Sequence, residues 1–207
     1  MNTDVMPAPS IDYIALLPMI IVGAAAVIGV LVEAFVGKAG RRPIQLVLAF
    51  GSLIGAFVAL AWQQANRGIQ AEGALAIDGP GILLMGLILI ISLLAALLIS
   101  ERQLDPAGDA FAPRASALPG SSRGYFQTEI WPLMLFAVLG MLLFVTATDF
   151  LVMFIALEIM SLPLYLMAGM ARRRRLLSQE AALKYFILGA FSSAFFLYGI
   201  AMLYGYS

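Results

Sequence analysis

The sequence contains no cysteine and no histidine. Without cysteine, the chain has neither disulfides nor thiolate ligands for iron–sulfur clusters. The absence of histidine excludes histidine-ligated haem, the usual zinc sites, and Ser-His or Cys-His nucleophile pairs. We therefore expect no cofactor-binding or metal-binding residues in this chain, and no redox chemistry from this chain alone.

Charged side chains are also scarce. They make up 12% of the 207 residues, and 12 basic residues balance 12 acidic ones. No strongly basic region is present, so nucleic acid is not an expected partner. Hydrophobic residues account for 62% of the chain and the mean hydropathy is +0.98. Soluble domains average about 45–50% apolar residues, so the composition indicates a membrane protein.

Long apolar stretches predict an all-α, polytopic membrane protein. A helix needs about 20 apolar residues to cross a bilayer core of about 30 Å. The N-terminal residues 1–12 hold no lysine or arginine, whereas a signal peptide begins with a basic region. We therefore expect the first stretch to remain as a span. Six transmembrane helices are predicted, at residues 13–36, 43–62, 80–99, 130–147, 150–171 and 181–204.

The distribution of basic residues predicts the orientation. They gather in the first, third and fifth loops, at Lys38, Arg41, Arg42, Arg102, Arg114, Arg123, Arg172, Arg173, Arg174 and Arg175. Loops rich in lysine and arginine face the cytoplasm. Both ends of the chain are then expected outside the cell membrane. The four consecutive arginines also suit anionic lipid head groups.

The long third loop divides the chain into three parts. Its proline, glycine and serine content disfavours regular structure. We expect helices one to three in residues 1–100, a flexible cytoplasmic loop in residues 101–128, and helices four to six in residues 129–207.

Glu158 is the first candidate functional residue, because it lies near the middle of an apolar stretch. A carboxylate at that depth costs at least about 2.5–3.5 kcal/mol on insertion. Such residues usually face a bundle interior or a wet cavity and mark ion or proton paths. Pro163 follows five positions later and is expected to bend the helix and admit water. The alternative is a structural glutamate with one hydrogen bond in a helix contact.

Lys184 is the second candidate. It lies about one turn inside the sixth helix, where a lysine can also extend its side chain to the interface. By residue count, its Cα height differs from that of Glu158 by roughly 10–13 Å, so we expect no direct ion pair. Glu33 is expected to pair near the surface with Lys38 or Arg42. Asp149 is expected to cap the fifth helix.

Three segments carry a family resemblance: EIWPLMLFAVLGMLLFVTATDFLVMF, LEIMSLPLYLMAGM and EAALKYFILGAFSSAFFLYGIAMLYG, together covering most of residues 129–205. They resemble the N subunit of bacterial proton-pumping NADH-quinone oxidoreductase, or complex I. The related M and L subunits and the multisubunit cation/proton antiporters do not usually carry SLPLY after the glutamate.

The resemblance implies a function in proton translocation. The family's glutamate maps to Glu158 and the lysine of EAALKY maps to Lys184. NADH, FMN, iron–sulfur clusters and quinone would be handled by partner subunits, and other membrane subunits would be neighbours. Family members are more than twice this length, so the chain would be the N-terminal part of an antiporter-like subunit, with residues 129–207 beginning the proton-translocating module. The alternatives are a subunit of a cation/proton antiporter and a non-catalytic truncated membrane scaffold.

Overall fold

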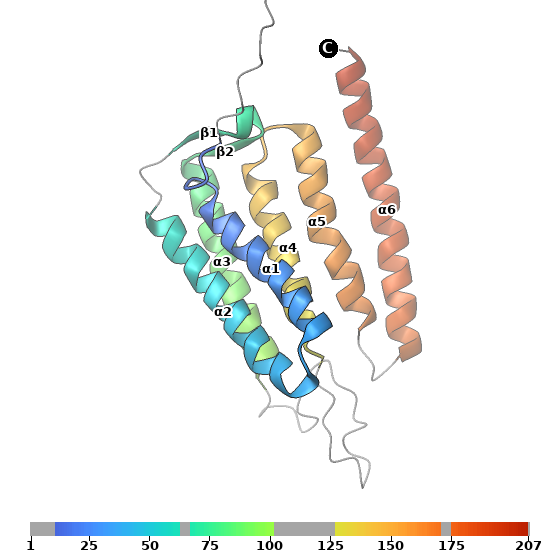
Figure 1. Cartoon of the computed structure of the whole chain (residues 1–207). Helices are drawn as coiled ribbons and strands as arrows, with labels where there is room; N and C mark the ends of the chain where they lie inside the picture. The colour runs from blue at the N-terminus through green and yellow to red at the C-terminus, as the bar shows by residue number, and fades with distance from the viewer. Residues whose placement is uncertain (1–10, 63–66, 102–126, 171–174, 207) are drawn as a thin grey trace, which may run out of the picture.

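A computed structural model describes residues 11–62, 67–101, 127–170 and 175–206 (Figure 1). Within these ranges the chain forms six α-helices and one small two-stranded sheet. The helices are α1 (Leu17–Phe35), α2 (Lys38–Trp62), α3 (Gly79–Ser100), α4 (Ile130–Thr146), α5 (Phe150–Gly169) and α6 (Arg175–Tyr206). The expected all-α membrane fold with six helices is confirmed.

Five of the described helices are long and apolar enough to cross a membrane, and α4 is the shorter one with 17 residues. At 1.5 Å per residue, α4 is about 26 Å long, slightly less than a hydrocarbon core of about 30 Å. The stretch expected as a full fourth span is therefore a shorter apolar helix.

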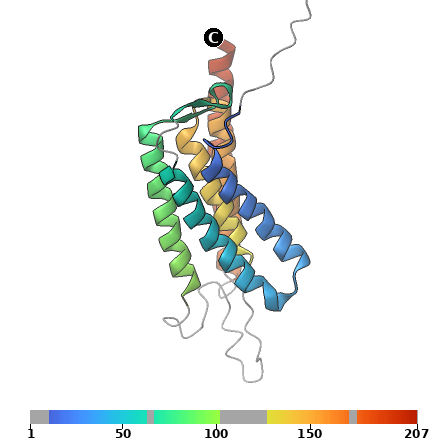
Figure 2. The same cartoon turned by 60° about the vertical axis from the view of Figure 1, so that its left-hand side comes forward.

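The short helix α4 lies at the centre of the bundle, in contact with α1, α2, α3 and α5. More than half of its residues are buried, and they include Trp131, Leu135 and Leu142. At one edge of the molecule α6 packs on α5 (Figure 1). On the other side, α2 and α3 lie next to each other (Figure 2). The core is thus concentrated around α4. By contrast, only 6% of the apolar, membrane-spanning part of α6 is buried.

A hairpin connects α2 to α3 and was not expected from the sequence. Strands β1 (Gly68–Gln70) and β2 (Leu75–Ile77) pair antiparallel around the 3-10 turn η2 (Ala71–Gly73). The hairpin is bound to the turn between α4 and α5. The backbone N–H of Thr148 donates to the Ala74 carbonyl at 3.1 Å, and the Thr148 hydroxyl donates to the carbonyl of Gly73.

Two helix boundaries differ from expectation at the basic segments. Lys38, Arg41 and Arg42 were expected in a loop, but α2 begins at Lys38 and only two residues separate it from α1. Helix α6 begins at Arg175 rather than at residue 181. Arginine, leucine, glutamine and glutamate have high helix propensity. The helical conformation therefore continues into the polar sequence that precedes the apolar part of each helix. Arg172, Arg173 and Arg174, and the loop at 102–126, lie outside the described residues.

Candidate functional site

The N-terminus of α5 is held by Asp149. Its carboxylate accepts hydrogen bonds from the backbone N–H groups of Leu151 at 2.7 Å and Val152 at 3.2 Å. These bonds satisfy N–H groups that a helix leaves unpaired in its first turn. The expectation that Asp149 caps this helix is confirmed. The same carboxylate accepts a hydrogen bond from the hydroxyl of Tyr204 at 2.8 Å, so it also ties α6 to α5.

Glu158 lies in the middle of α5 and is half-buried. Among the residues that the structure describes, no basic side chain lies within ion-pair distance of its carboxylate. The Ser161 hydroxyl donates to the backbone carbonyl of Glu158 at 3.4 Å. Pro163, which is buried, has no N–H to donate to the carbonyl of Ile159. The carboxylate is therefore followed directly by a backbone carbonyl that lacks its helical partner.

Gly140 of α4 sets the position of this part of α5. A Cβ atom built on Gly140 would lie 2.7 Å from Cα of Met160 and 2.8 Å from the carbonyl oxygen of Ala156. Both of these neighbours are two residues from Glu158. No side chain larger than hydrogen fits there, because the atoms in the way are backbone. The close approach of α4 and α5 thus fixes the backbone on either side of the carboxylate.

Lys184 lies on α6 and does not meet Glu158. Its ammonium is paired with the Glu180 carboxylate at 2.5 Å, and its side chain is 70% exposed. The expectation of no direct ion pair between Glu158 and Lys184 agrees with this arrangement. Sequence reasoning missed Glu180 as the partner, although its spacing of four residues from Lys184 is that of a helical ion pair.

Tyr165 joins α5 to α6 between the two candidate residues. It is 9% exposed, and its ring lies edge-on to Tyr185 with centroids 4.6 Å apart. The Tyr165 hydroxyl lies against Gly189, where a Cβ would overlap it. Aromatic packing of this geometry stabilises helix contacts beyond the area it buries. The structure therefore supports a packing function for Tyr165 and Gly189.

A second polar cluster lies between α1 and α2. The Arg41 guanidinium pairs with the Glu33 carboxylate at 3.3 Å, where Lys38 or Arg42 was expected as the partner. The Gln45 amide, which is fully buried, donates to Glu33 at 2.9 Å and to the Gly29 carbonyl at 2.8 Å. Gln45 was not singled out from the sequence. It keeps the near-interface carboxylate paired, so this cluster serves the contact between α1 and α2.

Comparison with known proteins shows what the chain is similar to. A family model described as NADH:quinone oxidoreductase/Mrp antiporter, TM, matches residues 147–207, which contain α5 and α6. NADH-quinone oxidoreductase subunit N of Parafrankia sp. (strain EAN1pec) is 56% identical over 207 residues, an alignment that covers 96% of this chain and 39% of that protein. Subunit N of Rhodococcus opacus (strain B4) is 53% identical, with 98% of this chain and 42% of that protein covered.

The chain is thus similar over nearly its whole length to NADH-quinone oxidoreductase subunit N of several bacteria. It spans 39% to 42% of the length of these relatives. It is also similar to a chain in the structure of respiratory complex I from Thermus thermophilus with bound aureothin. That similarity has a TM-score of 0.68 and 30% identity, over 92% of this chain and 37% of that one.

Proposed function

We propose that this chain is part of the membrane arm of a bacterial NADH-quinone oxidoreductase and takes part in proton translocation driven by electron transfer from NADH to quinone. The observation that carries the proposal is 56% identity to a subunit N across 96% of the chain. NADH, FMN, iron–sulfur clusters and quinone are assigned to partner subunits, and other membrane subunits to the surroundings of this chain. The absence of cysteine and histidine supports that division of labour.

Glu158 is the group we propose to exchange or relay protons. A carboxylate in mid-membrane is retained at a considerable insertion cost, which a translocation function explains. The carbonyl of Ile159, to which Pro163 cannot donate, gives a water molecule an acceptor next to the carboxylate. Lys184 is proposed as a second group of the same path, nearer the interface, where it pairs with Glu180.

The test separates pumping from electron transfer in the assembled complex. We expect Glu158→Gln to lower the number of protons pumped per NADH oxidised, because glutamine keeps the shape and loses the acid. Glu158→Asp should be milder, and Lys184→Ala should cost less than Glu158→Gln because Lys184 is exposed. Proton uptake and NADH oxidation are measured together in inverted membrane vesicles.

Glu72→Gln is the matched control, since Glu72 is an exposed carboxylate in the hairpin turn. It should pump like the wild type. Normal pumping by Glu158→Gln at normal turnover would contradict the proposal and leave Glu158 a structural residue. A larger loss for Lys184→Ala than for Glu158→Gln, at equal assembly, would put Lys184 in the main path instead.

The orientation is proposed from the basic residues: the Lys38 end of α2 in the cytoplasm and the hairpin outside. The natural chain has no cysteine, so single introduced cysteines report cleanly. Ala39 lies in the first turn of α2, and Ile69 lies in β1, which follows the other end of α2 in the chain. Both residues are exposed, so a cysteine at either position is accessible. With a membrane-impermeant maleimide, Ile69→Cys should label in intact cells and Ala39→Cys only after permeabilisation. The opposite pattern would reverse the orientation.

A cation/proton antiporter subunit is the second candidate function, because the matching family description includes the Mrp antiporters. Purification of the native assembly distinguishes the two. Flavin and iron–sulfur subunits that co-purify with this chain support the oxidoreductase. Their absence, together with sodium-dependent proton exchange by the purified assembly, would support the antiporter.

A further inference from the structure

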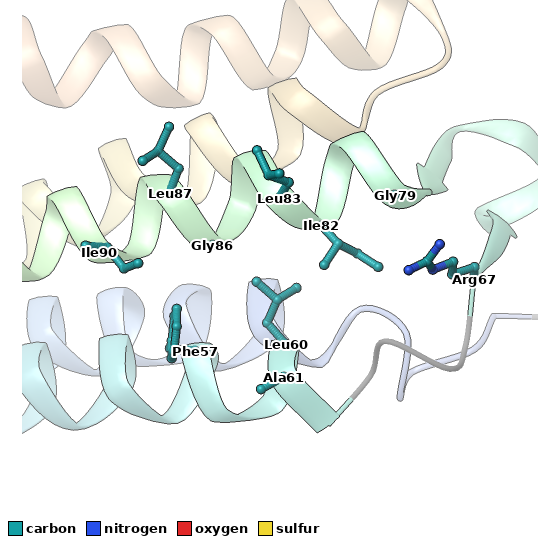
Figure 3. Close-up of a pocket in the computed structure, with 10 residues that line it drawn as sticks. All are labelled: Phe57, Leu60, Ala61, Arg67, Gly79, Ile82, Leu83, Gly86, Leu87 and Ile90. Atoms are coloured by element: carbon teal, nitrogen blue, oxygen red, sulfur yellow. The ribbon is translucent and has the colours of Figure 1, made fainter.

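The carboxylate of Glu158 has no polar neighbour in the cavity of about 490 Å³ that lies between α2 and α3 (Figure 3). Residues of α2 and α3, together with Arg67, line that cavity, whereas Glu158 belongs to α5. Helix α5 packs on α4 and α6. Among the described helices, a side chain that binds the carboxylate must therefore come from α4 or α6.

Glu158 points away from α4 and toward α6. The backbone that meets Gly140 of α4 belongs to the residues two positions before and two positions after Glu158. Two positions are about 200° around a helix, so Glu158 lies on the opposite side of α5. Phe154, four positions earlier, packs on Phe196 of α6, and Tyr165, seven positions later, also packs on α6. Residues at these spacings share one helix face.

The register between α5 and α6 places two serines at the level of Glu158. Eleven positions separate the two aromatic residues of α5, and eleven separate their partners Phe196 and Tyr185 on α6. The two helices therefore run antiparallel without a shift along this contact. Interpolation between the two ring pairs places Ser192 and Ser193 opposite Glu158.

Exposure distinguishes the two serines. Ser193 is partly buried, like Gly189, which precedes it by four positions and lies against the Tyr165 hydroxyl. Ser192 is exposed. Positions four apart lie on the same face of a helix, so Ser193 belongs to the face of α6 that packs on α5.

Two polar groups thus lie at one level of the contact between α5 and α6. Among the residues that the structure describes, neither the Glu158 carboxylate nor the Ser193 hydroxyl has a hydrogen bond to another protein group. Polar groups left unbonded in apolar surroundings are costly. One water molecule bridges two such groups when they are too far apart for a direct hydrogen bond.

We propose that Ser193 is a positioning residue for Glu158, with its hydroxyl bound to the carboxylate through one water molecule. The inference rests on the proposed function of Glu158 in proton translocation and names the group that holds the carboxylate in place. A serine hydroxyl both donates and accepts, so it serves the ionised and the protonated carboxyl alike. No covalent bond forms at Ser193, and the proton leaves or reaches Glu158 through the water.

The test is the rate at which dicyclohexylcarbodiimide labels Glu158 in membranes that contain the assembled complex. This apolar reagent reacts with protonated carboxyl groups, and mass spectrometry locates the product. Hydrogen bonding to the charged form favours that form, so loss of the hydroxyl should speed the reaction. We expect Ser193→Val to be labelled about five-fold faster than Ser193→Thr, which is the effect of one ordinary hydrogen bond.

The variants are matched in shape. Valine and threonine have the same outline and add the same methyl group, so any overpacking affects both alike. Ser193→Ala adds no volume and should be labelled as fast as Ser193→Val. Ser193→Thr should behave like the wild type. Ser192→Val is the control on the exposed side of α6, and its labelling rate should equal that of the wild type.

Proton pumping per NADH oxidised is the second readout. Ser193→Val should pump less than Ser193→Thr in a chain that keeps Glu158. In a chain that carries Glu158→Gln, the two variants at Ser193 should pump equally, because a positioning residue acts only through the group that it holds.

Equal labelling of Ser193→Val, Ser193→Ala and Ser193→Thr would overturn the link to Glu158, even if Glu158→Gln abolishes pumping. A further loss from Ser193→Val in the Glu158→Gln chain would show that Ser193 acts elsewhere, and would also overturn the inference. Normal pumping by Glu158→Gln would overturn the proposed function itself, and the positioning function with it, whatever the labelling rates are.

Discussion

At the residue scale, Asp149 joins two helices through one carboxylate. It caps α5 and accepts a hydrogen bond from the hydroxyl of Tyr204 on α6. The pKa of Asp149 is lowered from its ordinary value of 3.8, first by the Tyr204 hydrogen bond and then by the N–H groups of Val152 and Leu151. All three donors prefer the ionised carboxylate. The contact between α5 and α6 at this end therefore depends on the charge of Asp149.

This link predicts a pH-dependent effect of Tyr204→Phe. A carboxyl whose pKa is lower in the folded state contributes stability above its unfolded pKa of 3.8 and loses it as the pH falls through the folded value. The wild type should thus melt at a higher temperature than Tyr204→Phe near pH 6, and the difference should shrink below about pH 3.8. Helical circular dichroism in detergent measures it.

Tyr206→Phe is the control, because Tyr206 is 95% exposed on the same helix. It should melt like the wild type at each pH. A difference between the wild type and Tyr204→Phe that stays constant across the titration would mean that the hydroxyl acts through packing and not through the Asp149 charge.

Individual polar residues show how far the sequence predicts the site. The cap at Asp149 and the helical position of Glu158 follow from local rules, and the structure agrees with both. The Glu180–Lys184 pair was within reach of the same rules, because its spacing is local. The hydrogen bonds of Gln45 could not be predicted in this way, because its partners Gly29 and Glu33 lie on another helix. Residue type alone does not reveal which helices meet.

At the scale of elements, the contact between α4 and α5 depends on Gly140. Glycines allow helices to pack closely, but the sequence does not reveal which partner each one meets. In the structure, Gly140 faces the backbone of Ala156 and Met160, which flank Glu158. The position of the carboxylate is therefore a property of the helix pair, determined by a residue that has no side chain of its own.

Gly140→Ala should consequently destabilise the bundle by about 1–3 kcal/mol, the usual cost of overpacking. In the assembled complex it should also lower proton pumping, because α5 must shift to admit the methyl group. Gly51→Ala is the control, since a Cβ there meets nothing within 4 Å. Thermal unfolding and pumping in vesicles measure the two effects. A Gly140→Ala protein with wild-type stability would show that α4 and α5 are not in this close contact.

The elements that sequence reasoning missed are those with weak patterns. Strands β1 and β2 have three residues each, too few for alternation to be recognised. They are stabilised by the turn between α4 and α5, where Thr148 donates hydrogen bonds to the Gly73 and Ala74 carbonyls and Ala147 forms a bridge with Leu75. The polar starts of α2 and α6 were likewise assigned to loops, because apolarity detects the part of a helix within the membrane and not its extension beyond it.

At the scale of the whole molecule, the distribution of burial is uneven. The core lies around α4, whereas α6 contributes little to it, because only 6% of its apolar, membrane-spanning part is buried. Large side chains such as Phe191, Phe195 and Tyr198 are exposed on α6. The chain also spans only 39% to 42% of the length of its relatives. The exposed face of α6 is therefore suited to contact lipid or further helices.

The last prediction concerns the 207-residue chain by itself in proteoliposomes. We expect it to insert but to show no proton flux that depends on Glu158. Among the described residues, Glu158 has no basic partner, and Lys184 is paired with Glu180 instead. A carboxylate in apolar surroundings needs a charge partner or water on both sides to exchange a proton across the membrane. The readout is acidification reported by a pH-sensitive dye, with Glu158→Gln as the comparison and a full-length subunit N as the reference. Flux from the wild-type chain that Glu158→Gln abolishes would mean that these six helices already contain a working path.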